Sequence, residues 1–141
     1  MGFNLSIAGA ETINLYEKSI ETVEFSVDTP DDSNARSTDV GSSVIITGKI
    51  LTFVDGSLED EVVKIATWSL VPAESSDSYR ELKIDVIVAD RVVRTVTFPK
   101  AFVVEYTEDF DEESGTGTFK LHAKQKKDAV ANLTYEGNFG V

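Results

Sequence analysis

Acid–base or nucleophilic chemistry in this chain would depend on His122, because it is the only histidine and cysteine is absent. A Ser–His–acid site needs a histidine held beside a nucleophile, and thiolate catalysis or cysteine-based zinc binding needs cysteine. His122 lies between Lys120 and Lys124 on the expected polar face of a strand. G-x-S-x-G, H-E-x-x-H and glycine-rich phosphate motifs do not occur. We therefore expect a solvated histidine, no enzyme and no cofactor; a small hydrolase that uses His122 is the weakest alternative.

The acidic segment that starts at Asp109 superficially resembles a calcium-binding loop. Its glycine, Gly115, stands at the seventh place instead of the sixth, and the twelfth place, where a bidentate glutamate belongs, is Lys120. Carboxylates are abundant elsewhere, but no two are singled out as the pair that glycoside hydrolysis requires. We expect no metal site.

The charges are arranged in two blocks along the chain. Acidic residues are concentrated between Glu105 and Glu113, and basic residues between Lys120 and Lys127. If the two segments form a hairpin, Glu105 and Thr107 lie near Lys120 and His122 as cross-strand neighbours. Such a surface is either a solvated face or a subunit interface at which acidic and basic edges meet. The candidate ring-interface charges are Glu105, Asp109, Glu112, Glu113, Lys120, Lys124 and Lys126.

Length and composition indicate one globular domain over residues 1–141. The chain has 41% hydrophobic residues and a net charge of -12, and a mean hydropathy of -0.10. Phosphate backbones repel such a chain, so sequence recognition of nucleic acid is not expected. No apolar run approaches the roughly 18 residues of a membrane-spanning helix. The first residues lack a basic region and a long apolar region, so we expect synthesis and folding in the cytoplasm without a signal peptide.

Alternation of period two predicts that most of the chain forms strands. Pro99 and Lys100 are expected to separate two of these strands, because proline cannot donate to a central ladder, and Ala89-Asp90 is expected to form a turn. The expected strands are 23–27, 43–53, 79–88, 91–98, 102–106, 119–123 and 133–139.

One helix is predicted from Ser57 to Leu70. Ser57 can cap it, and acidic residues follow in the first turn, where the helix dipole favours them. Leu58, Val62, Ile65 and Trp68 have the spacing of one apolar stripe. The expected fold is mainly β, with two packed antiparallel sheets or a distorted barrel and this one short helix. The expected core consists of Phe25, Ile46, Ile84, Val86, Val96, Phe102, Val104, Phe119 and Leu121.

The segment Asp28–Ser42 is long and polar. Hairpin connections need only two to five residues, and ordering a longer segment costs about 1–2 kcal/mol per residue of backbone entropy. A surface loop and a functional loop are both compatible with this composition. We predict that it contacts a neighbouring ring or subunit through Asp31, Asp32, Asn34, Arg36 and Asp39.

Several segments together resemble the tube-forming superfamily of contractile injection machines, which includes the Hcp protein of type VI secretion and phage tail-tube proteins. The similar features are a strand ending in Phe98-Pro99, then Ala101–Val104, a polar turn, and Gly117–Leu121 before a lysine-rich end. Ser43–Ile50 follows the long polar loop and precedes the helix, which resembles the order of extended loop, strand and single helix in those proteins. Type VI secretion, an extracellular injection system and a phage or prophage tail all remain open.

The resemblance implies a structural subunit without an active site. Copies would close into hexameric rings that stack into an inner tube, with sheath, baseplate or spike proteins and effector cargo as partners and release as part of the particle. Joined sheet edges would also remove exposed edge strands. The alternative from a different class is a monomeric β-sandwich module that binds carbohydrate or a protein partner.

Overall fold

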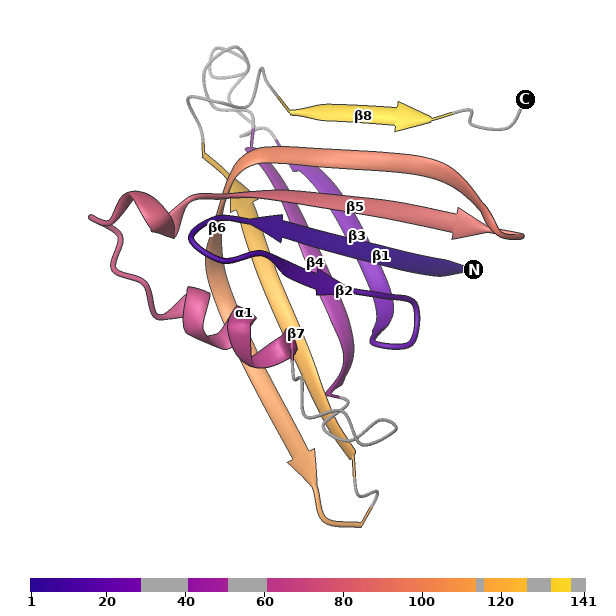
Figure 1. Cartoon of the computed structure of the whole chain (residues 1–141), viewed down its shortest axis with the longest axis horizontal. Helices are drawn as coiled ribbons and strands as arrows, with labels where there is room; N and C mark the ends of the chain where they lie inside the picture. The colour runs from indigo at the N-terminus through magenta and orange to yellow at the C-terminus, as the bar shows by residue number, and fades with distance from the viewer. Residues whose placement is uncertain (29–40, 51–60, 114–115, 127–132, 138–141) are drawn as a thin grey trace.

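The computed structural model describes residues 1–28, 41–50, 61–113, 116–126 and 133–137, and it is mainly β (Figure 1). Its elements are β1 (Gly2–Ala8), β2 (Ile13–Leu15), β3 (Ile20–Asp28), β4 (Gly41–Ile50), α1 (Glu61–Ser69), the 3-10 helix η2 (Ser76–Ser78), β5 (Arg80–Val88), β6 (Arg91–Asp111), β7 (Thr116–Gln125) and β8 (Thr134–Gly137).

All strand pairs are antiparallel, in the order β2-β1-β5-β6-β7-β4-β3, and β8 also pairs with β6. β6 belongs to two sheets. Its first half runs beside β5 and β8, and its second half turns steeply and runs beside β7 (Figure 1). The predicted mainly β architecture with one α-helix is confirmed for the described residues: a sheet of β2, β1, β5 and β6 crosses a sheet of β6, β7, β4 and β3.

The expected break at Pro99 is wrong, because Pro99 lies inside β6, which is one strand of 21 residues. Arg80 pairs with Ala101 while Leu82 pairs with Phe98, so Pro99 lies in a bulge. The ladder needs no hydrogen bond from residue 99 there, so the missing N–H of proline is tolerated. The neighbouring backbone is tied to β7 instead: Lys100 N–H donates to Gln125 Oε1 (3.2 Å). The bulge lets one strand bend from the first sheet into the second.

The core fills the space between the two crossing sheets. Ile46, Ile84, Val96, Phe119 and Leu121 are buried as predicted, whereas Phe25, Val86 and Phe102 are half-buried. Val104 is 47% exposed, which contradicts the prediction. The pairing skips from Val103 opposite Ala123 to Glu105 opposite His122, so a bulge at Val104 breaks the alternation. Further buried side chains come from the unpredicted strands β1 and β2, namely Leu5, Ile7, Ile13 and Leu15.

The helix α1 presents the predicted apolar stripe to the core. Val62, Ile65 and Trp68 are buried; the proposed cap Ser57 lies outside the described residues. Trp68 Nε1–H donates to the backbone oxygen of Ser78 (3.0 Å), which ties α1 to η2. At nine residues, α1 cannot cross a membrane, and the described ranges contain no other helix that could.

The junction between η2 and β5 contains an ion pair between a buried arginine and a partly exposed aspartate. Arg80 is 4% exposed, and its Nη2 lies 2.6 Å from Asp77 Oδ2. The guanidinium also lies 5.6 Å from the centre of the Trp68 ring. Arg80 as a hydrogen-bond partner, joined by the Ala10 N–H, lowers the pKa of Asp77 from its ordinary 3.8. The pair therefore joins the β1–β2 turn, η2 and the helix.

Candidate subunit interface

The second half of β6 has one edge without a partner strand. Ala101 pairs with Arg80 on one side and with Gln125 on the other, so β5 and β7 occupy opposite edges of β6. β5 pairing ends at Ala101, whereas β7 pairing continues to Asp111. Among the described residues, no strand pairs with the other edge of β6 beyond Ala101. An edge without a neighbouring strand can accept one from another chain.

β3 provides the second open edge of the same sheet. It pairs with β4 along Ile20–Asp28 and is the last strand in the sheet order, with no further partner in the described ranges. Within the described ranges, four strands in the order β3-β4-β7-β6 thus form a sheet with an open strand at each side. β3 and β6 run in opposite directions, because each of the three intervening pairs is antiparallel.

The predicted hairpin register is confirmed, and it brings most of the candidate charges onto the solvent face of this sheet. Glu105 is paired with His122, and Thr107 with Lys120. Lys124 and Asp109 lie on the same face, two residues farther along their strands. Carboxylates of β6 and lysines of β7 therefore share one face, but among the described residues no ion pair joins them.

The remaining candidate residues do not join that face. Glu112 and Glu113 lie in the turn at the end of the hairpin, where Glu113 N–H donates to Asp111 Oδ1 (3.0 Å). Lys126 follows β7, and its Nζ lies 5.0 Å from the centre of the Tyr79 ring. The loop candidates Asp31, Asp32, Asn34, Arg36 and Asp39, like Lys127, lie outside the described residues.

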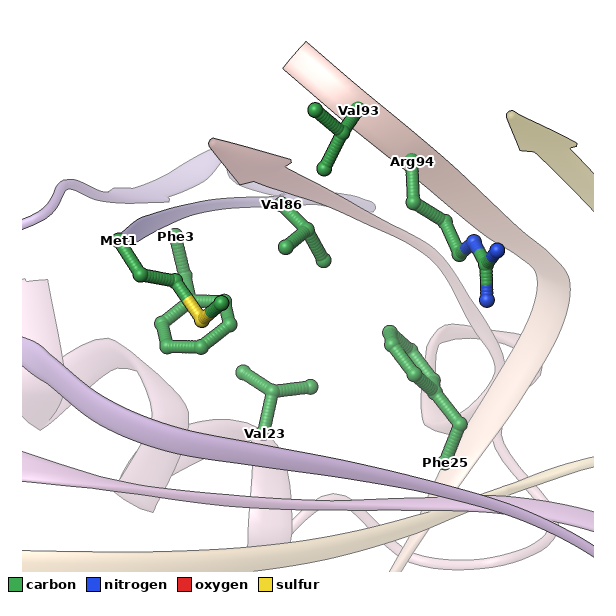
Figure 2. A pocket seen from close by; sticks show the side chains of 7 residues that line it. All are labelled: Met1, Phe3, Val23, Phe25, Val86, Val93 and Arg94. Atoms are coloured by element: carbon green, nitrogen blue, oxygen red, sulfur yellow. The ribbon is translucent and has the colours of Figure 1, made fainter. Parts of the chain in front are cut away.

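An apolar pocket, not predicted from the sequence, lies where the two sheets separate. Figure 2 shows side chains of both sheets around a common space of about 540 Å³. β3 contributes Val23 and Phe25 from one sheet, and the opposite sheet contributes Met1, Phe3, Val86, Val93 and Arg94. Alternation did indicate apolar faces on 23–27 and 79–88, but β1 was not predicted, and only the spatial separation of the sheets reveals that the faces do not meet here.

Comparison with known proteins identifies the fold. No protein-family model and no curated protein matches the chain. Hcp1 from Flavobacterium johnsoniae superposes with a TM-score of 0.58 at 17% identity, covering 98% of this chain and 97% of that one. Hcp1 from the E. coli EAEC 042 pathovar gives 0.55 at 8% identity, covering 97% and 99%.

A third similar chain comes from the sheath–tube complex of PVC, an extracellular contractile injection system. Its TM-score is 0.53 at 11% identity, with 96% of this chain and 88% of that chain covered. These likenesses extend over almost the whole chain, and they confirm the fold that the sequence resemblance implied. The protein therefore has the fold of Hcp and of chains from contractile injection systems.

Proposed function

We propose that this protein is a structural subunit that assembles head-to-tail into rings, which stack as the inner tube of a contractile injection machine. The observation that carries the proposal is the four-stranded sheet with an open edge on β3 and another on β6. The fold shared with Hcp supports the same conclusion. A conduit of this kind needs walls and no catalytic residues.

The directions of the two open strands suit such an assembly. β3 of one copy can lie beside β6 of the next in antiparallel orientation, so the sheet continues across the subunit boundary. Each copy uses two different edges, and this heterologous contact closes into a ring when the rotation between copies closes. Ring closure would also cover both edges, which otherwise invite uncontrolled strand addition.

Ring size, partners and location are further parts of the proposal. We propose six copies per ring, stacking through the Asp28–Ser42 segment, and a cytoplasmic subunit that leaves the cell within the particle. Similar chains come from an anti-feeding prophage baseplate and from the PVC sheath–tube complex. By analogy, sheath, baseplate or spike proteins and effector cargo are the expected partners.

Sedimentation and electron microscopy of the purified protein test the proposal. We expect ring-sized species and, at high concentration, stacked rings. A 15 kDa monomer over a wide concentration range would refute the proposal and favour the monomeric binding module.

Hydrogen exchange locates the contact. Half of the β6 amides beyond Ala101 face the open edge, and they should exchange fast in dilute monomer and slowly in rings. β5 is the internal control, since it is paired on both edges with β1 and β6 and should be protected in both states. Protection of β6 that does not change on assembly would show that its edge is not the contact.

A further inference from the structure

We propose that the apolar pocket beside β3 is a socket for the Val104–Phe110 segment of β6 from a second copy. This inference rests on the proposed function and adds the side chains that hold neighbouring copies together. The described residues that line the pocket are mainly apolar, and Arg94 is the one charged side chain among them (Figure 2).

The position of the pocket relative to the open edge selects the occupant. Val23 and Phe25 line the pocket and belong to β3, whose outer edge is open among the described residues. A strand added to that edge extends the same sheet, so its core-facing side chains continue the layer formed by Val23 and Phe25. In the head-to-tail arrangement, the added strand is β6 of the neighbour.

The core-facing side chains of β6 suit an apolar socket. Tyr106, Glu108 and Phe110 pair with Leu121, Phe119 and Gly117, so they lie on the core side of the sheet. Phe110 is nevertheless 63% exposed, because the end of the hairpin extends beyond the two-sheet body (Figure 1). Val104, at the bulge, is 47% exposed. Both side chains lie on the strand whose edge is open, so a neighbouring copy that adds to this edge can cover them.

The charges of the two surfaces are complementary. In the described part of the chain, no carboxylate lies within ion-pair distance of Arg94. Glu108 is the carboxylate on the core side between Val104 and Phe110, since Glu105 and Asp109 lie on the opposite face. Tyr106 donates a hydrogen bond to Glu108 (2.6 Å), which holds the carboxylate on this strand in place. Arg94 of one copy and Glu108 of the next therefore form the expected polar contact of an otherwise apolar joint.

A charge exchange tests this pairing. Arg94→Glu and Glu108→Arg should each raise the concentration for half-maximal ring formation at least tenfold. Mixing the two variants, or combining them in one chain, should restore assembly to within about threefold of the original. Lys83→Glu is the matched control, because it makes the same charge change at an exposed position on β5 and should have no effect. Circular dichroism and thermal unfolding must show that each monomer is folded.

The apolar part of the joint has its own variant. Val104→Asp should raise the concentration for half-maximal ring formation at least tenfold. Val63→Asp is the control and should leave that concentration unchanged, because Val63 lies on the solvent side of α1 and is 54% exposed. Native mass spectrometry tests the rival occupant: an acyl-chain ligand retained in the pocket would overturn the proposal.

Three results distinguish the socket from ring formation itself. Unmodified protein that never forms rings overturns the proposed function. Normal rings from Arg94→Glu and Val104→Asp overturn the socket and leave the proposed function intact. Loss of rings in both single charge variants without recovery in the double variant overturns the pairing of Arg94 with Glu108, and with it the socket as stated.

Discussion

Removal of Asp77 should cost much more stability than removal of another carboxylate with the same sequence spacing to its partner. Asp77→Ala leaves Arg80 charged and buried, with a side chain only 3% exposed, and removes the acceptor of the Ala10 N–H. Breaking a fully buried pair from one side costs about 3–5 kcal/mol, and because the Asp77 side chain is 28% exposed we expect the lower end, about 3 kcal/mol. At roughly 3 °C per kcal/mol for a domain of this size, the melting temperature should fall by about 10 °C.

Glu61→Ala is the matched control. Glu61 and Lys64 form the other described i,i+3 ion pair. The two carboxylates are similarly exposed, Glu61 at 24% and Asp77 at 28%, but the cation Lys64 is 36% exposed whereas Arg80 is 3% exposed. Removal of Glu61 leaves a lysine that water can reach, and pairs with a solvated cation contribute about 0–1 kcal/mol, so the melting temperature should change by a few degrees at most. Calorimetry of both variants at neutral pH measures the contrast.

A double variant tests the cause of the loss. Asp77→Ala combined with Arg80→Met removes the stranded charge and keeps an apolar stem beside Trp68, so it should recover most of the lost stability. A loss below about 1 kcal/mol for Asp77→Ala, or no recovery in the double variant, would refute the argument from burial.

Acid should reduce the difference in stability between the original protein and Asp77→Ala. The pKa of Asp77 is lowered in the folded state from 3.8, so the stability gained from its charge is present above about pH 4. That gain is lost as the pH falls below 3.8 toward the folded-state pKa. The difference between the original protein and Asp77→Ala should therefore shrink in calorimetric scans below pH 3.8. A constant difference would show that the carboxylate charge is not what stabilises this junction.

Three further outcomes are expected. Phe119→Ala should cost about 3–5 kcal/mol in denaturant unfolding because the ring is 2% exposed, while Phe102→Ala, half-buried, should cost clearly less; equal losses would contradict the burial pattern. Charge reversal at Lys124 and Lys126 together should weaken rings in sedimentation but leave the monomer's circular dichroism unchanged; an unfolded monomer would contradict a role limited to the interface. A short Gly-Ser linker in place of Asp31–Asp39 should allow rings and reduce stacking in electron micrographs; unimpaired stacking would refute the loop's role.

Most of the central strands were predictable from alternation, β1 and β2 were missed, and the errors within the predicted strands at Pro99 and Val104 coincide with bulges. The bulge at Val104 inserts one extra residue, so the side chains after it no longer follow the in–out alternation of those before it. Pro99 is tolerated in a strand because it lies in a second bulge. Periodicity contains no signal for either irregularity. The Ala89-Asp90 turn was recognisable, and both residues have the positive φ angles (52° and 63°) that a two-residue hairpin turn requires.

The hairpin register was predictable from charge, but the open edges were not. Complementary side chains around Glu105 and His122 constrain the local pairing, and the structure has the same register. An open edge, in contrast, depends on which distant strands become neighbours. The pocket similarly depends on how far β3 lies from β1 and β5, and Arg94 in isolation gives no indication of it.

Because β6 runs unbroken through both sheets, it also determines how the subunit would respond to force. A pull along its second half reaches the first sheet through covalent backbone, without a loop in between that could extend. The hydrogen bonds to β5 and β7 lie across the strand, so they are loaded together in shear and not opened one after another. Rupture then requires many bonds to fail at once. A neighbour that adds its own strand to β6 or β3 would be loaded in the same geometry, so mechanical resistance would extend from one copy to the next.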